Sequence, residues 1–346
     1  MKRYVGLDVS QKTTAICVVD DEGRTLAEGV TATEPDAIAA FVRRRAPDAV
    51  RIGMETGPLA IWLWNELRAL ELPMVCMDAR HANAGLKVML AKTDRNDAAG
   101  IAQLVRTGWF RQVHVKAEAS HAVRAELATR TLLVRMRCDL ENQIRGVLKT
   151  FGLVVGKSPS RLVKRAYELV ADELAEKPDF ASLVDSLLAM RADVVERIAA
   201  IDAKLRARAR TTPVCRRFMT VPGVGPITAL AVWAGIDDAA RFARPEDVGA
   251  YFGLTPRRYA SGEVNRSGRI TKRGDGTVRT LLYEAANVLL VKITRSCALR
   301  EWGLAIAKRS GFKKAKVAVA RKLAVLLHRL WRDGTEFRWS AAPAAV

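Results

Sequence analysis

The first 110 residues alternate between short apolar runs and amphipathic segments. The apolar runs have the length and the β-branched content of strands, whereas the amphipathic segments repeat at helical spacing. Strands are expected at residues 3–9, 14–20, 25–30, 49–55 and 73–78, and helices at 34–45, 61–70 and 93–106. Three strands in succession, followed by alternating helices and strands, favour a ribonuclease-H-like α/β layer over a doubly wound nucleotide-binding fold.

From about residue 118 the apolar positions repeat at helical spacing along two long segments. One set consists of Leu133, Met136, Leu140, Ile144 and Val147. A second set forms a seam of about three heptads and consists of Leu183, Leu187, Met190, Val194, Ile198, Ile201 and Leu205. The two predicted helices could pair with each other in an antiparallel hairpin, or they could pair with a second chain.

The last region begins near residue 213 and is also mainly helical. The segment 221–226, Val-Pro-Gly-Val-Gly-Pro, is typical of a helix-hairpin-helix turn. Gly223 and Gly225 would leave backbone N–H groups free to contact a phosphate there, although a simple glycine-rich connection has the same sequence. A basic turn at 257–276 and helices at 278–293 and 312–331 follow. We therefore expect a ribonuclease-H-like domain at 1–115, a helical coiled-coil region at 116–210 and a mainly helical domain at 211–346.

The positive charge of the chain is concentrated toward its C-terminus. The formal net charge is +20. Residues 1–120 carry 16 Lys and Arg against 15 Asp and Glu, whereas residues 251–346 carry 20 against 6. This asymmetry predicts a polyanionic partner, although a generally basic composition is the simpler alternative. The five scattered cysteines contain no Cys-x-x-Cys pair, and no signal peptide or membrane span is expected, so the chain fits the reducing cytoplasm.

Four carboxylates in the first hundred residues are the strongest chemical signal. Asp8 and Glu55 each follow an apolar run, and Asp94 and Asp97 lie three residues apart at a predicted helix start. A turn or a helix cap would explain one acid alone, but acids that converge from strand ends and a helix start repel one another unless a cation lies between them. Oxygen ligands suit Mg²⁺ or Mn²⁺, and such ions support phosphoryl transfer.

A serine and a group of cations form a second constellation. Ser261 precedes Gly262 on a predicted loop, which would expose its hydroxyl. The surrounding cations are Arg257, Arg258, Arg266, Arg269, Lys272, Arg273 and Arg279. They could hold a phosphate for attack by the serine, or the serine could only hydrogen-bond a phosphate that they grip. Ser267 is an alternative hydroxyl, and no histidine lies near enough in sequence to support a Ser-His-Asp hydrolase.

The quoted segments resemble one known family, insertion-sequence family 110, the DEDD transposases, whose relatives include the pilin-gene invertases. Asp8, Glu55, Asp94 and Asp97 stand in contexts that look like its acidic tetrad. Segments 221–226, 252–259, 261–262 and 268–274 look like its C-terminal domain. The resemblance implies a catalytic domain of the Holliday-junction-resolvase type that binds Mg²⁺, a nucleophile at Ser261, and site-specific DNA recombination, in some members guided by a structured noncoding RNA.

Recombination of two duplexes implies a homodimer or a tetramer, with the helices at 116–210 as the expected contact. The expected location is the cytoplasm, in association with the nucleoid. Three other functions remain open from the residues. One is a metal-dependent nuclease or junction resolvase that uses water as the nucleophile. Another is an actin-like ATPase or sugar kinase, because the segment 5–10 before a β-hairpin is typical of a phosphate loop. The third is an architectural DNA-binding protein without activity.

Overall fold

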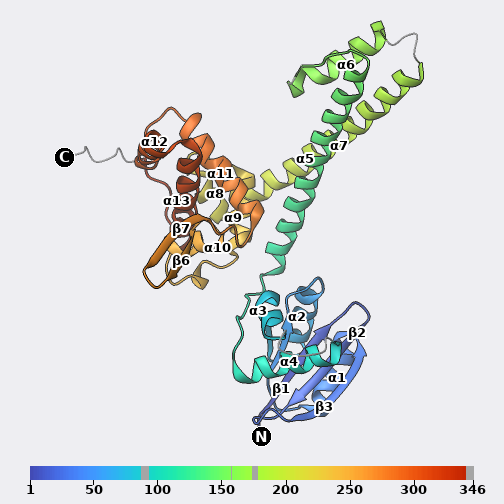
Figure 1. The fold of residues 1–346 in the computed structure, drawn as a ribbon, viewed down its shortest axis with the longest axis vertical. Coiled ribbons are helices and arrows are strands. Elements are labelled where there is room, and N and C mark those ends of the chain that lie inside the picture. The colour runs from blue at the N-terminus through green and yellow to red at the C-terminus, as the bar shows by residue number, and fades with distance from the viewer. Residues whose placement is uncertain (87–92, 157, 174–177, 340–346) are drawn as a thin grey trace, which may run out of the picture. The chain divides into compact units, whose positions relative to one another are not determined.

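The computed structural model describes residues 1–346 except 87–92, 157, 174–177 and 340–346 (Figure 1). The chain forms two compact units, Met1–Lys116 and Ala117–Val346. The expected division of the second unit at residue 210 stays a prediction. No helix in the described ranges combines the length and the apolar character that a membrane crossing requires.

The first unit is built on a mixed five-stranded sheet with the order β3-β2-β1-β4-β5. Its strands are β1 (Arg3–Val9), β2 (Thr13–Val19), β3 (Thr25–Ala32), β4 (Ala49–Glu55) and β5 (Met74–Met77). The first three strands are antiparallel, and β4 and β5 run parallel to β1 and to each other. The predicted α/β sheet is therefore confirmed, with each strand within two residues of its expected bounds.

Helices cover both faces of this sheet (Figure 1). They are α1 (Pro35–Arg45), α2 (Ala60–Ala69), α3 (Ala79–Leu86) and α4 (Asp94–Thr107). Val5 and Leu7 of β1 pack with residues of α1 and α2 on one face. The side chains of α4 pack on the other face, where Ala98 contacts the apolar residues of β2. Alternation of side chains along β1 therefore sends Gly6 and Asp8 toward the face that α4 covers.

The second unit begins with two long helices that lie side by side (Figure 1). They are α5 (Glu118–Thr150) and α7 (Pro178–Thr211), with α6 (Pro159–Glu173) between them in sequence. Arg130 forms an ion pair with Asp202, and Arg191 forms one with Glu141. Arg130 and Glu141 follow one another along α5, whereas their partners Asp202 and Arg191 follow in the reverse order along α7. The two helices therefore run antiparallel. The intrachain hairpin is thus present, whereas a coiled coil with a second chain stays a prediction.

The burial of α7 differs from the predicted seam in its first half. Val184 and Leu188 are buried, whereas Leu183 and Met190 are about half exposed. Val194, Ile198 and Leu205 are buried as expected. The true stripe therefore lies one residue away from the predicted one at the start of the helix, because α7 packs there against α6 and the end of α5.

The remaining elements form one hydrophobic core together with the start of α5 and the end of α7. They are α8 (Pro213–Met219), α9 (Pro226–Ile236), the 3-10 helix η1 (Ala239–Arg241), α10 (Glu246–Tyr251), β6 (Pro256–Ser261), β7 (Val264–Ile270), α11 (Gly276–Val291), α12 (Ala298–Ser310) and α13 (Phe312–Asp333). The mainly helical character is confirmed. The segment expected as a basic turn at 257–276 instead contains the two-stranded sheet of β6 and β7.

Candidate functional site

Asp8 and Glu55 lie at the carboxyl ends of two neighbouring parallel strands. Leu7 of β1 is in register with Met54 of β4, so the residues that follow them, Asp8 and Glu55, lie side by side on the two strands. Gly6 and Gly53 are also in register, and a β-carbon on either would meet residues of α4. Because side chains two residues apart share a face, Asp8 and Glu55 project from the α4 face of the sheet. Both residues are partly buried.

The first turn of α4 carries Asp94 and Asp97, and this helix packs on the same face of the sheet. Thr93 caps the helix, and its Oγ1 accepts a hydrogen bond from the Asn96 N–H at 3.2 Å. Asp97 directly precedes Ala98, whose carbonyl oxygen would lie 2.1 Å from a β-carbon on Gly6. The helix therefore crosses β1 two residues from Asp8. Asp97 is partly buried, whereas Asp94 is exposed. Three of the predicted acids thus share one region of the α4 face.

The side chains themselves are not drawn together into a metal cage. Among the residues that the structure describes, no group of three His, Cys, Asp or Glu side chains could hold a metal ion. The donor set still fits a hard divalent cation, because every candidate ligand is a carboxylate and oxygen ligands are what such ions prefer. Asp8, Glu55 and Asp97 would have to turn inward from a backbone arrangement that already places them on one face.

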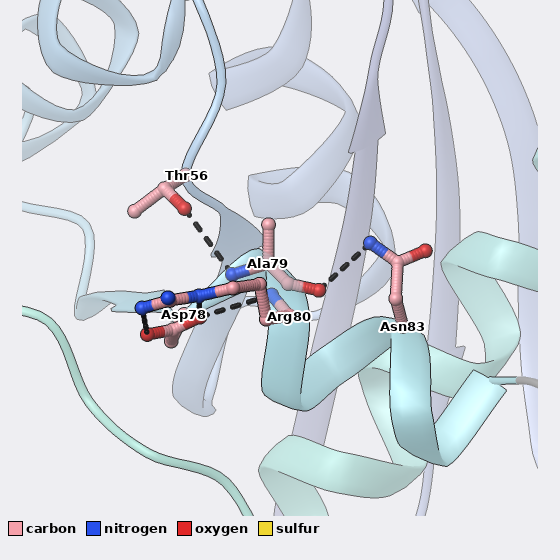
Figure 2. Close-up of polar contacts among 5 residues, drawn as sticks. All are labelled: Thr56, Asp78, Ala79, Arg80 and Asn83. Atoms are coloured by element: carbon pink, nitrogen blue, oxygen red, sulfur yellow. Dashed lines mark hydrogen bonds and ion pairs between the residues drawn. The ribbon is translucent and has the colours of Figure 1, made fainter. Parts of the chain in front are cut away.

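The third parallel strand ends in an acid that the sequence analysis did not single out. Figure 2 shows Asp78, which follows β5 and receives hydrogen bonds from Arg80 Nη2 at 3.0 Å and from Arg80 Nε at 3.3 Å. The Arg80 guanidinium lowers the pKa of this carboxyl below its usual value. Its signal in the sequence was the same as that of Glu55, an acid at the end of an apolar run. Asp78 forms an ion pair with Arg80 and accepts a hydrogen bond from the Arg80 backbone N–H at 2.9 Å, which stabilises the start of α3.

Thr56 ties the end of β4 to the same helix (Figure 2). Its Oγ1 accepts a hydrogen bond from the Ala79 N–H at 3.2 Å, and its own N–H donates to the Met77 carbonyl oxygen at 3.0 Å. Asn83 Nδ2 donates to the Ala79 carbonyl oxygen at 2.7 Å. These bonds fix the backbone directly after Glu55. The carboxyl end of β4 is therefore held in place on the side away from β1.

Ser261 lies at the tip of the hairpin that β6 and β7 form. It pairs with Val264 across a two-residue turn made by Gly262 and Glu263. Gly262 has a φ of +55° and Glu263 has a negative φ, which is the pattern of a type II′ hairpin turn with glycine at its first position. Ser261 is exposed. The tight turn therefore presents the serine hydroxyl at the surface, as the Ser-Gly sequence predicted.

The register of the hairpin separates the two candidate serines. Tyr259 pairs with Arg266, and Arg258 pairs with Ser267. Since cross-strand partners share a face and neighbours alternate, Ser261 lies on the face of Tyr259 and Arg266, whereas Ser267 lies on the opposite face with Arg258. Arg266 is thus the predicted cation that most clearly shares a surface with the Ser261 hydroxyl.

Two of the other predicted cations are bound within the fold. Arg279 Nη1 donates to the Phe252 carbonyl oxygen at 3.1 Å and to the Arg273 carbonyl oxygen at 3.4 Å. Arg257 Nη2 donates to the Thr271 carbonyl oxygen at 3.5 Å. Arg269, Lys272 and Arg273 are exposed along β7 and the loop that follows it. Arg279 therefore stabilises the base of the hairpin, and a role for it in nucleic-acid binding stays a prediction.

The glycine-rich segment 221–226 connects α8 to α9. Gly223 has a φ of +89°, and a β-carbon there would lie 2.5 Å from the carbonyl oxygen of Ala285 in α11. Gly225 is exposed and precedes the first residue of α9. Close packing on α11 accounts for Gly223. The helix-hairpin-helix motif and the phosphate contacts at Gly223 and Gly225 stay predictions.

Comparison with known proteins identifies the family. The DEDD transposase model of the IS110 group matches residues 5–152, which include all four acids. The model of the transposase IS116/IS110/IS902 family matches residues 215–300, which include Ser261. A probable family 20 transposase of Pseudomonas aeruginosa is 33% identical over 258 residues, covering 71% of this chain and 74% of the relative. The chain belongs to the IS110 family of transposases.

Two further relatives agree with this assignment. The transposase for insertion sequence element IS1111A of Coxiella burnetii is 28% identical over 344 residues, covering 98% of this transposase and 92% of the relative. The transposase for insertion sequence element IS1328 of Yersinia enterocolitica is 28% identical over 247 residues, covering 71% and 73%. The chain is therefore a DNA-cleaving recombinase, and its DEDD domain implies the use of a divalent metal.

Proposed function

We propose that this transposase cuts and rejoins DNA through an acidic site in its first unit and a serine nucleophile in its second. The first unit is assigned to the ribonuclease-H-like class of the Holliday-junction-resolvase type. The sheet order β3-β2-β1-β4-β5, with acids at the ends of β1 and β4, supports this assignment. The acids and Ser261 belong to different units, and the proposal gives both a role in one recombination reaction.

The observation that carries the proposal is the presentation of Ser261 at the tip of an exposed hairpin. The Ser261 oxygen forms a bond to the phosphorus of a DNA phosphodiester, and the bond from that phosphorus to one deoxyribose oxygen breaks. The hydroxyl proton leaves Oγ, and the departing oxygen gains a proton. Arg266 would pair with the phosphate oxygens, and its position on the same face of the hairpin supports this role. Attack by a new deoxyribose hydroxyl reverses these steps, so rejoining needs no external energy source.

Asp8, Glu55 and Asp97, together with Asp94, would hold Mg²⁺ or Mn²⁺. A bound divalent ion would supply positive charge to stabilise the oxygens of the reacting phosphate. The chain's own contribution is to place these carboxylates at the ends of two strands and one helix, where their mutual repulsion favours a cation. The arginines near Ser261 supply positive charge to the phosphate that the serine attacks.

The partners follow from the same chemistry. A homodimer or tetramer is proposed because two duplexes must be held together, and the α5–α7 hairpin exposes Leu132, Met136 and Met190 as candidate contacts. A guide noncoding RNA and association with the nucleoid are proposed from the family resemblance and from the basic C-terminal region. Besides Arg266, the proposed contacts to nucleic-acid phosphates are Gly223, Gly225, Arg257, Arg258, Arg269, Lys272, Arg273 and Arg279.

The nucleophile is tested by covalent trapping. Labelled DNA that carries the ends of the insertion sequence is incubated with the protein and Mn²⁺, and the products are then separated on a denaturing gel. We expect a protein–DNA band with the wild type and with Ser267→Ala, but none with Ser261→Ala. Strand cleavage without any such band would instead support a nuclease or resolvase that uses water. A band that persists in Ser261→Ala would refute the assignment.

The acidic site is tested by metal binding as well as by cleavage. Asp8→Asn and Asp97→Asn should each weaken Mn²⁺ binding measured by calorimetry and should lower strand cleavage, because each removes one charged ligand. Asp36→Asn, at an exposed acid in the first turn of α1, serves as the matched control. Unchanged Mn²⁺ binding in both site variants would refute the acidic site and leave the serine proposal to be judged on its own gel.

A further inference from the structure

A large groove lies in the second unit between the hairpin and the last two helices. Its volume is about 1480 Å³. The walls come from β7, from the start of α12, from α13 and from the segment after α13 that contains Phe337. All of α13 and the segment after it lie beyond the residues 215–300 that the C-terminal family model matches. The β7 wall and the start of α12 lie inside that match, whereas the α13 wall lies outside it.

The rim of the groove is strongly basic. Arg and Lys side chains provide eight of its lining residues, and Glu246 is the single acid among them. Glu246 is already paired with Arg329 at 2.8 Å. Lys313 and Lys314 are exposed and form no ion pair with any residue that the structure describes. The uncompensated charge points to a polyanion as the ligand.

The floor of the groove is apolar and contains aromatic rings. Trp302 and Phe337 are partly buried there, with Leu299 and Val325 among the aliphatic neighbours. The Lys322 ammonium lies 3.8 Å from the centroid of the Trp302 ring. A DNA duplex presents phosphates and keeps its bases stacked inside, so it would leave an apolar floor unfilled. An unpaired strand can place bases on aromatic rings while its phosphates meet cations.

The groove belongs to the face of the hairpin opposite Ser261. Pro256, Ser267 and Ile270 all line it, and the register places Pro256 and Ile270 opposite each other on the face that Ser267 shares. A β-bulge in β7 next to Ser267 brings Arg269 to the same side. Ser261 does not line the groove. A strand held here is therefore separate from the phosphate that Ser261 is proposed to attack.

We propose that this groove binds an unpaired DNA strand, with its bases against Trp302 and Phe337 and its phosphates against Lys313, Lys314 and Arg269. DNA is the assigned source because the chain belongs to a family of DNA transposases. The Lys322 ammonium lies over the Trp302 ring, so in this proposal it moves off that face to pair with a phosphate when a base stacks. The site extends the proposed function by adding a place for a separated strand during recombination.

The test measures binding rather than cleavage, by fluorescence anisotropy of labelled oligodeoxythymidine over a range of salt concentrations. The double variant Lys313→Ala/Lys314→Ala is compared with Lys308→Ala/Arg309→Ala, which removes the same charge from the exposed end of α12 outside the groove. We expect the first pair to reduce the slope of log affinity against log salt by about 1.4, since each phosphate contact of a single strand contributes about 0.7. The control pair should leave the slope unchanged.

A stacking contribution distinguishes this site from a merely basic surface. Trp302→Ala should weaken oligodeoxythymidine binding about tenfold, and Trp302→Phe should retain most of it because a ring remains. The Phe variant also guards against a loss that comes only from misfolding. Equal weakening of duplex binding, tighter binding of oligouridine than of oligodeoxythymidine, or equal effects of the two lysine pairs would each overturn the proposal. The denaturing gel for the covalent protein–DNA band tests the serine nucleophile without measuring binding to this groove. Failure of either proposal can therefore be recognised separately.

Discussion

The carbonyl oxygen of Ala98 would lie 2.1 Å from a β-carbon added to Gly6. Only glycine at position 6 therefore allows α4, which carries Asp94 and Asp97, to lie this close to β1. The same helix approaches Gly53, where a β-carbon would lie 2.1 Å from Cγ2 of Val105. Two glycines in register on neighbouring strands therefore let α4 lie close to the face of the sheet from which Asp8 and Glu55 project.

Replacing Gly6 by alanine should displace α4 and damage the acidic site. We expect Gly6→Ala to destabilise the protein by about 1–3 kcal/mol, the usual cost of overpacking, and to weaken Mn²⁺ binding. Thermal unfolding and calorimetry measure the two effects. Gly57→Ala is the matched control, because a β-carbon at Gly57 would meet no atom within 4 Å. Normal stability and normal Mn²⁺ binding in Gly6→Ala would contradict this view of α4.

The turn at Gly262 should control how fast Ser261 reacts. Its φ of +55° is costly for a residue with a side chain, by about 1–2 kcal/mol, and asparagine tolerates it better than alanine. We expect the rate of covalent adduct formation to fall in the order wild type, Gly262→Asn, Gly262→Ala. Thermal unfolding should change little, because the turn is exposed. Equal adduct rates in the three proteins would show that the turn does not position the serine.

The ion pair between Arg124 of α5 and Asp275 should make stability depend on pH. Burial raises the pKa of the Asp275 carboxyl, but the Arg124 charge and the hydrogen bonds from Val278, Arg124 and Thr277 outweigh it and lower the pKa. A lowered folded-state pKa gives stability that is present above the unfolded value and is lost as pH falls through the folded value.

Asp275→Asn keeps a cap for α11 and removes the charge. We expect it to cost about 1–3 kcal/mol near neutral pH, and the difference from wild type should shrink as the pH falls below about 4. Urea unfolding at several pH values measures this. Asp247→Asn, in the exposed pair with Arg244, should cost about 0–1 kcal/mol at neutral pH. A pH-independent difference for Asp275→Asn would contradict the ion-pair explanation.

The stability of the α5–α7 hairpin should depend on the ion pair that Arg191 forms with Glu141. The Arg191 guanidinium donates to Glu141 Oε1 at 3.0 Å, and the Glu141 side chain is only 5% exposed. Among the ion pairs of the described residues, Arg191→Met leaves the buried Glu141 carboxylate with the longer contact to Arg137, at 3.7 Å, so we expect a loss of about 3 kcal/mol in chemical unfolding. Arg197→Met, at an exposed position of the same helix, should have little effect. Similar losses for the two variants would show that the hairpin does not rely on this pair.

The sheet was predictable because its strands carry an almost continuous apolar signal. β4 was expected at its observed bounds, and the acids at the carboxyl ends of β1 and β4 were visible as polar residues at the ends of apolar runs. The close approach of α4 was not visible, because it depends on Gly6 and Gly53 being in register, which only the paired strands define. A glycine in a strand looks the same in sequence whether or not a helix lies against it.

The second unit shows where sequence reasoning fails. The seam of α7 was placed on Leu183 and Met190 instead of Val184 and Leu188, because apolar residues occupy both stripes and periodicity alone cannot choose between them. The hairpin of β6 and β7 is exposed and basic, so it lacks the apolar alternation that marks a strand. The groove was not predicted because its walls come from residues as far apart as Glu246 and Arg338.

The most direct test of the central claim is to map the covalent link by mass spectrometry. Trypsin cleaves after Arg258, Arg266 and Arg269, so Ser261 and Ser267 fall in the separate peptides 259–266 and 267–269. The adduct formed with DNA is digested with nuclease and trypsin, and the peptides are searched for a serine that carries phosphate. The account predicts this mass on peptide 259–266, at Ser261. A modified peptide 267–269, or cleaved DNA with neither peptide modified, would contradict it.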